Sequence, residues 1–180
     1  MMHLRTTPAP ASATVRVLGI DPGSRRTGFG VLDAAGARLT YVASGVIRTD
    51  GGDFAARLCE IFRCVQSIVA EYRPQEIAIE RVFVKRNVDS ALKLGQARGA
   101  AICGAAAANA AFFEYAPRQI KLAVVGSGSA EKGQVQVMMK SMLRLEGSVA
   151  ADAADALAAA VCHAVRGRLR AAILQTAGRG

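Results

Sequence analysis

The sequence is poor in the residues that build zinc sites and disulfide frameworks. Its 180 residues include four cysteines and two histidines, and no two cysteines form a Cys-x-x-Cys pair. This composition argues against a zinc site. Each cysteine stands in an apolar, helix-like stretch, so we expect four free, buried thiols in a reducing compartment.

Long hydrophobic stretches are also missing. The longest apolar stretch, residues 99–113, consists mostly of alanine and glycine, and it is too short and too weakly hydrophobic to span a bilayer. Residues 1–14 are rich in Ala, Pro, Thr and Ser and lack the apolar core of a signal peptide. We therefore expect a disordered N-terminal tail over 1–14, no contact with a membrane, and a cytoplasmic location.

Acidic residues are scarce relative to basic ones. The chain has 23 Lys and Arg against 14 Asp and Glu, which gives a formal net charge of +9 and a pI near 10.0. Such a balance favours a polyanionic partner, nucleic acid first and an anionic membrane second. The length and the hydrophobic fraction of 52% fit one globular domain. We assign that domain to residues 15–170 and expect a flexible C-terminal tail over 171–180.

Hydrophobic periodicity predicts three consecutive strands, followed by alternating helices and strands. The expected strands cover residues 15–21, 28–33, 38–47, 76–80 and 112–115, and the expected helices cover 54–72, 90–109, 117–125, 134–145 and 152–169. Strand 76–80 should lie parallel to strand 15–21 after a right-handed crossover. The pattern predicts an α/β fold, a mixed five-stranded sheet flanked by helices on both faces.

Four acids stand at positions where they could meet. Asp21 closes an apolar strand just before a Pro-Gly turn, and Glu80 closes a second strand. If the two strands are adjacent and parallel, both carboxylates emerge at one sheet edge, where ligands bind in open α/β sheets. Asp152 and Asp155 lie three residues apart, on one face of an otherwise apolar helix. Taken singly, each acid also fits a helix cap, a first-turn acid or the rim of a loop. Their coincidence points to a shared site.

Carboxylates gathered in one place repel one another unless a cation lies between them. All-oxygen ligands select hard ions, so we expect Mg²⁺, with Mn²⁺ as a substitute. We expect two such ions per active site, a known arrangement for phosphodiester hydrolysis. A basic chain with an acidic metal pocket fits a nuclease, in which cations hold the phosphates and acids hold the metals.

Six stretches of the chain resemble the RuvC family of Holliday-junction resolvases, which have the RNase H-like fold. They are GIDPGSR (19–25), TGFG (27–30), AIERVF (78–83), SALKLGQARG (90–99), AEKGQVQ (130–136) and DAADAL (152–157), in the family's order. The resemblance implies a homodimeric, Mg²⁺-dependent endonuclease that acts in recombination and DNA repair. It would cut a four-way DNA junction by two symmetric nicks in strands of like polarity. It also implies a partner, a branch-migration complex of the RuvA and RuvB type.

The matching positions carry the family's functional residues onto this sequence. The four metal-binding, catalytic acids fall on Asp21, Glu80, Asp152 and Asp155. The expected DNA contacts are Phe83, as an aromatic that stacks on a base at the crossover, together with Arg86, Lys93, Arg98, Lys121 and Lys132. From the residues alone, Phe83 also fits a core position, and the cations fit ordinary surface charges.

Two further features have two interpretations each. The Gly- and Ala-rich helix 90–109 is either a dimer seam, because small residues allow close helix approach, or a helix buried against its own sheet. His163 lies two turns after Asp155 and is either an assistant to a metal ligand or a satisfied, partly buried histidine.

Other functional classes compete with the nuclease. Gly-Ile-Asp-Pro-Gly also resembles a phosphate-loop hairpin of actin-like ATP-handling proteins, but the sequence has no second Asp-x-Gly hairpin. A junction-binding protein without catalysis is a second alternative, and the four intact acids argue against it. A pre-ribosomal-RNA nuclease of related fold is a third, and the 90–99 stretch argues against that one.

Overall fold

The computed structural model describes residues 13–81 and 87–177. Its elements are β1 (Val15–Asp21), β2 (Arg26–Ala35), β3 (Arg38–Arg48), α1 (Phe54–Tyr72), β4 (Glu76–Glu80), α2 (Val88–Ala105), β5 (Ala111–Tyr115), α3 (Pro117–Val125), α4 (Lys132–Leu143) and α5 (Ala151–Ala177). This order confirms the predicted meander of three strands followed by alternating helices and strands.

The five strands form one mixed sheet in the order β3-β2-β1-β4-β5. The first three strands are antiparallel neighbours, whereas β4 and β5 continue the sheet in parallel with β1. Ile20 pairs with Ile79, so the residues that follow them, Asp21 and Glu80, end adjacent strands at the same edge. The predicted parallel crossover is therefore confirmed.

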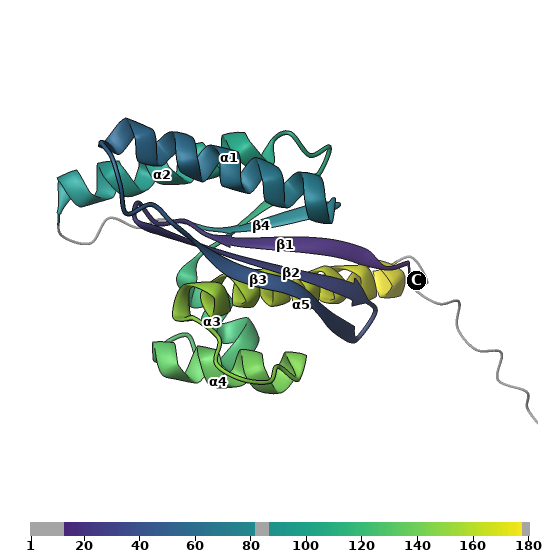
Figure 1. Cartoon of the computed structure of the whole chain (residues 1–180). Helices are drawn as coiled ribbons and strands as arrows, with labels where there is room; N and C mark the ends of the chain where they lie inside the picture. The colour runs from purple at the N-terminus through teal and green to yellow at the C-terminus, as the bar shows by residue number, and fades with distance from the viewer. Residues whose placement is uncertain (1–12, 82–86, 178–180) are drawn as a thin grey trace, which may run out of the picture.

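Helices cover both faces of the sheet, as Figure 1 shows, with α1 and α2 on one side and α5, backed by α3 and α4, on the other. Asp53 begins α1 by accepting a hydrogen bond from the Ala56 amide at 2.8 Å. The helix buries a stripe at spacings of three and four residues, formed by Ile61, Val65, Ile68 and Val69. This stripe contributes to the core on the α1 side of the sheet.

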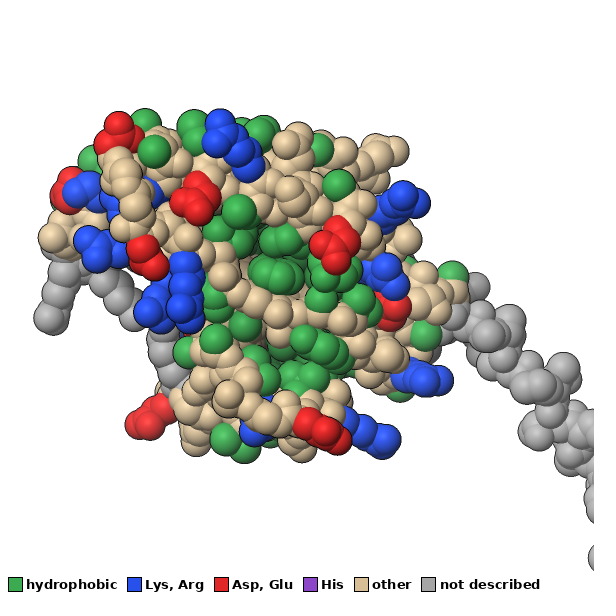
Figure 2. All heavy atoms as spheres, viewed as in Figure 1, with side chains coloured by type: hydrophobic (Ala, Val, Ile, Leu, Met, Phe, Trp, Pro, Cys, Tyr) green, Lys and Arg blue, Asp and Glu red, His purple; other side chains and the backbone are tan. Residues whose placement is uncertain are grey.

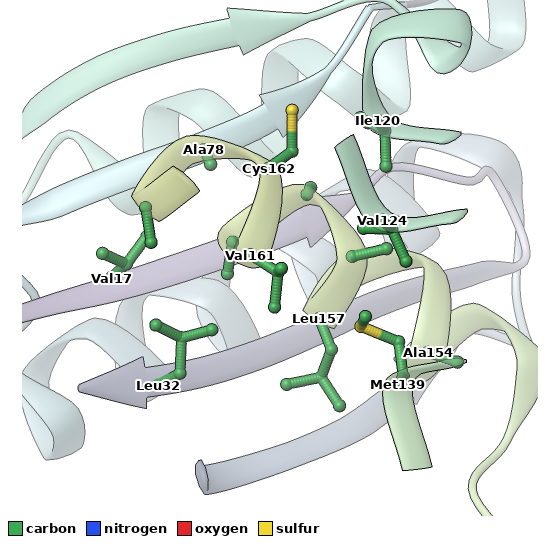
Figure 3. Close-up of a cluster of buried hydrophobic side chains, with 14 of the residues drawn as sticks. Val17, Leu32, Ala78, Ile120, Val124, Met139, Ala154, Leu157, Val161 and Cys162 are labelled. Atoms are coloured by element: carbon green, nitrogen blue, oxygen red, sulfur yellow. The ribbon is translucent and has the colours of Figure 1, made fainter. Parts of the chain in front are cut away.

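The other core forms where α5 lies directly on β1 and β2 (Figure 3). Its helix side is mostly alanine, with Leu157 and Val161 fully buried. Close approach also depends on glycines in the strands. A Cβ at Gly19 would overlap the carbonyl oxygen of Ala156, and a Cβ at Gly28 would overlap that of Asp152. Two strand glycines thus set how deeply the start of α5 sits on the sheet.

Three expected helices have different ends in the structure. The helix expected over 134–145 runs over Lys132–Leu143. The helix expected over 90–109 begins at Val88 and ends at Ala105. The chain then enters the sheet, where the Ala111 amide donates to the Gln75 carbonyl oxygen at 3.1 Å and starts β5. The last helix continues to Ala177 instead of ending near residue 169. The sequence after 169 contains strong helix formers and no proline, so nothing local stops the helix.

The expectation of four buried thiols is wrong. All four cysteines are free, but only Cys162 is buried, while Cys59 and Cys103 are exposed and Cys64 is half-buried. A surface helix has both a buried and a solvent-facing side, so a cysteine's place in a predicted helix does not show whether its thiol is buried. Of the helices that the structure describes, none combines the length and the apolar character that a membrane span requires.

A large groove lies beside the start of α5. It measures about 600 Å³ and runs between β3 and the segment that joins α4 to α5. Figure 2 shows hydrophobic side chains gathered in the hollow of this face, with Lys and Arg around it. None of the ten candidate site residues lines the groove, so its size does not mark the chemistry.

Candidate active site

Three of the four candidate acids line one cavity. Asp21 comes from the end of β1, Glu80 from the end of β4 and Asp155 from the first turns of α5. The cavity measures about 270 Å³, and Pro117, Ile120, Lys121 and Val135 complete its wall. All three acids are half-buried. The structure thus brings together carboxylates from segments that are far apart in the sequence.

Asp152 lies beside this cavity and not in its wall. Its carboxylate Oδ2 is 4.0 Å from Nη1 of Arg26, and its side chain is 25% exposed. Arg26 begins β2, directly after the turn that follows Asp21. The fourth acid therefore occupies the rim of the site, next to a cation that the sequence analysis did not single out.

The donor set of the cavity fits a hard divalent cation. It offers carboxylate oxygens only, without a thiol or an imidazole. Across residues 13–81 and 87–177, however, no three His, Cys, Asp or Glu side chains are arranged closely enough to hold one metal ion. The carboxylates share a cavity but do not form a closed ligand set. Mutual repulsion of like charges is a physical reason for such an open arrangement.

Lys121 is the cation in the wall of the cavity. It projects from α3, which Pro117 begins and Gln119 caps through its side-chain oxygen on the Ala116 amide. The side chain is half-buried, unlike most surface lysines. Of the expected DNA contacts whose side chains the structure describes, Lys121 is the one that lines the cavity with the acids.

Arg98 is half-buried and contacts the end of β4, which carries Glu80. Its Nε donates to the carbonyl oxygen of Glu80 at 3.4 Å, and its Nη2 is paired with Glu114. Glu114 also accepts from Arg81 at 3.3 Å. These partners, Arg98 first, hold the pKa of the Glu114 carboxyl below its usual range. Arg98 thus joins α2 to the ends of β4 and β5 through contacts that the sequence did not indicate, and its contact with DNA stays a prediction.

His163 is a satisfied, buried histidine, which agrees with the second of its two interpretations. Its Nδ1 lies 2.7 Å from the Tyr115 hydroxyl, and its Nε2 lies 2.6 Å from Oε2 of Glu76. The ring also packs 4.3 Å from the Phe113 ring. Burial raises the pKa of the Tyr115 hydroxyl, which keeps it a neutral hydrogen-bonding group. The cluster fastens α5 to β4 and β5 and has its own partners, apart from the acids.

The other four expected DNA contacts are either exposed or not described by the structure. Lys93 is exposed and pairs with Asp89 at 2.7 Å, one helical turn earlier. Phe83 and Arg86 lie outside the described residues. Lys132 begins α4, but the structure does not describe its side chain.

The comparisons with known proteins agree on one family. The family model described as "Crossover junction endodeoxyribonuclease RuvC" matches residues 17–163. Proteins of that name from Pseudoalteromonas translucida and Methylococcus capsulatus are 51% and 57% identical. The first match covers 86% of this chain and 98% of the relative, and the second covers 82% and 89%.

Solved structures show the same likeness. Thermus thermophilus RuvC in complex with a Holliday junction substrate matches with a TM-score of 0.79 and 32% identity, over 86% of this chain and 96% of that one. The yeast mitochondrial Holliday junction resolvase, at 14% identity and a TM-score of 0.60, shares the fold. By sequence and by structure, this chain belongs to the RuvC family of crossover junction endodeoxyribonucleases.

Proposed function

We propose that this chain resolves four-way DNA junctions by metal-dependent hydrolysis, with two symmetric nicks in strands of like polarity. The observation that carries the proposal is the cavity in which Asp21, Glu80 and Asp155 meet Lys121. Three acids and a cation in one half-buried wall suit a phosphodiester, whose hydrolysis needs bound metal and neutralisation of phosphate charge. Family membership and the net charge of +9 support DNA as the substrate.

In this proposal, Asp21, Glu80 and Asp155 would draw together around Mg²⁺ once its charge offsets their repulsion, and Asp152 would contribute from the rim. Bound there, the metal would supply Lewis acidity toward the phosphoryl oxygens and activation of the attacking water. Lys121 places its ammonium where negative charge develops on the phosphate. Arg98, anchored on Glu114, fixes the backbone at Glu80 and so orients that carboxylate. Phe83, Arg86 and Lys132 are proposed contacts to the DNA around the cut.

A dimer suits a substrate with two equivalent strands to cut. We propose the outer face of α2 as its seam. Val88 and Leu92 are 70% and 62% exposed there, and a Cβ added at Gly95 or Gly99 would meet no atom within 4 Å. An exposed helix face with large apolar side chains and open glycines leaves room for a second helix to approach closely.

The test uses a mobile four-way junction, Mg²⁺ and the Asp21→Asn variant. The wild type should make paired nicks that DNA ligase reseals. The variant should bind the junction and cut it at least a thousandfold more slowly, because a metal ligand has lost its charge (roughly 4 kcal/mol in the barrier). Glu146→Gln is the matched control, an equally conservative change at an exposed acid outside the cavity.

Two results would contradict the proposal. The first is cleavage of linear duplex DNA at the rate measured for the junction. The second is undiminished cutting by Asp21→Asn.

A further inference from the structure

A second polar cavity lies at the catalytic edge of the sheet, on the α1 side. It measures about 220 Å³ and is lined by Arg25, Thr49, Asp50, Gly52 and Arg57. Arg25 belongs to the turn between β1 and β2, and Arg57 to the start of α1. None of these five residues is among the ten expected site residues.

Hydrogen bonds connect the loops that line the cavity. Thr49 is buried and joins its two loops, because its amide donates to the Arg25 carbonyl at 3.0 Å and its hydroxyl donates to the Ser24 carbonyl at 3.2 Å. Asp53 caps α1 and so fixes the helix that carries Arg57. Arg25 therefore lies in a turn that Thr49 holds by hydrogen bonds, and Arg57 lies in the first turns of a capped helix.

Neither arginine forms an ion pair with a carboxylate in the part of the chain that the structure describes. Among the described residues, no carboxylate oxygen lies within 4.0 Å of the Arg25 or Arg57 guanidinium, although Asp50 lines the same cavity. The Arg57 guanidinium lies over the Phe54 ring at 5.1 Å, and its buried Nε has no hydrogen-bond partner in the described part of the chain. A buried N–H group without a hydrogen-bond acceptor costs free energy. An anion that accepts a hydrogen bond from the Arg57 guanidinium would therefore stabilise it.

The short distance between this cavity and the acids favours a DNA phosphate as the anion. Arg25 is four residues after Asp21, so their Cα atoms are at most about 14 Å apart. That reach corresponds to roughly four nucleotides of one strand, at 3.4 Å of rise each. A DNA strand that lies across the acids thus brings its backbone within range of this cavity. Arginine forks also match phosphate oxygens in a bidentate way.

We infer that Arg25 and Arg57 form a seat for a phosphate of the DNA backbone that is not cut, a few nucleotides from the cleaved bond. The inference rests on the proposed function, because it takes the substrate strand to cross Asp21. The seat binds backbone without reading bases, so it fixes the position of the strand over the acids. Asp50 opposes the seat by placing negative charge in the same cavity.

The experiment measures junction affinity by fluorescence anisotropy in EDTA, where no cutting occurs, over a series of salt concentrations. Arg57→Gln should bind roughly tenfold more weakly, and the slope of log K against log salt should fall by about one. Arg25→Gln should give the same result, and it tests the seat even if the change at Arg57 harms folding. Arg57→Lys should keep the slope, and Asp50→Asn should bind more tightly.

The matched control is Arg63→Gln, which removes an exposed charge of the same helix outside the cavity and should leave the slope unchanged. A wild-type slope in both Arg57→Gln and Arg25→Gln would overturn the seat, and so would weaker binding by Asp50→Asn. The same series on linear duplex DNA separates the two proposals. If the wild type fails to cut junctions, the proposed function fails, while the duplex slopes still decide whether the arginines hold phosphate.

Discussion

At the scale of single residues, the site is a set of charges with unequal surroundings. Asp21, Glu80 and Asp155 share a cavity with Lys121, whereas Asp152 faces Arg26 at the rim. The sequence indicated the acids, because strand ends and helix starts follow from local patterns. It did not indicate the pairing of Arg98 with Glu114 or of His163 with Glu76, since those contacts join positions 16 and 87 residues apart.

Stability should depend on pH through Glu114. Its folded pKa is lowered from 4.5, chiefly by the hydrogen bond from Arg98, so the carboxylate stabilises the fold above the unfolded pKa. This contribution is lost as pH falls through the folded pKa. Glu114→Gln should lower Tm near neutral pH by at most about 4 °C, since the partly exposed pair contributes no more than about 1 kcal/mol.

Thermal unfolding followed by circular dichroism, at several pH values, checks this prediction. The difference between wild type and Glu114→Gln should shrink as the pH drops below about 4.5. Glu146→Gln, at an exposed acid, should show no such trend. A difference that grows toward acid would contradict the assignment.

At the scale of elements, the site depends on how α5 meets the sheet. Several elements could be predicted closely, including α1 with its Asp53 cap and β4 between Glu76 and Glu80, because their apolar spacing and stop signals are local. The end of α2 could not, since its alanine-rich continuation favours helix while pairing with the sheet recruits Ala111 into β5. The close packing of α5 on β1 and β2 could not be predicted either, because a glycine in a strand does not show which element packs against it.

Gly28→Ala should separate the start of α5 from the sheet. The new Cβ would overlap the Asp152 carbonyl oxygen, and backbone cannot turn aside as a side chain can. We expect a loss of about 1–3 kcal/mol of stability and a marked fall in the cutting rate, because Asp152 and Asp155 move with the helix. Junction binding should persist.

Denaturant unfolding and single-turnover cleavage measure the two effects of Gly28→Ala. Gly133→Ala is the control, since a Cβ there meets nothing within 4 Å and alanine favours the helix by up to about 1 kcal/mol. Wild-type cutting by Gly28→Ala would show that the acids tolerate a displaced helix.

At the scale of the whole molecule, the two faces of the sheet carry different groups of charged residues. Helix α5 lies on one side of the sheet and α1 and α2 on the other (Figure 1). The α5 side carries the helix acids and Lys121, whereas the α1 side carries the arginine cavity and the exposed apolar residues of α2. The mixed sheet and its two helical layers could be predicted from the alternation of strands and helices. The arginine cavity could not, because Arg25, Asp50 and Arg57 meet only once the β1–β2 turn and the start of α1 are folded side by side.

Leu92→Arg should prevent the chain from pairing with a second copy. Leu92 is 62% exposed on α2, so a charge there costs the folded monomer little but would be buried without a partner in a helix–helix seam. We expect sedimentation to show a monomer and cleavage to lose its paired nicks. Val137→Arg, at a residue 69% exposed on α4, should remain dimeric. A dimeric Leu92→Arg protein would place the seam elsewhere.

The spread of the acids along the chain also has a consequence for protein synthesis. Asp21 and Glu80 are made early, but Asp155 belongs to α5, which begins only at residue 151 and covers β1 and β2. A nascent chain that has reached residue 148 therefore has neither a complete cavity nor a closed core. An unfinished copy therefore lacks Asp155 and the helix that completes the cavity, both of which the proposed cutting of DNA requires.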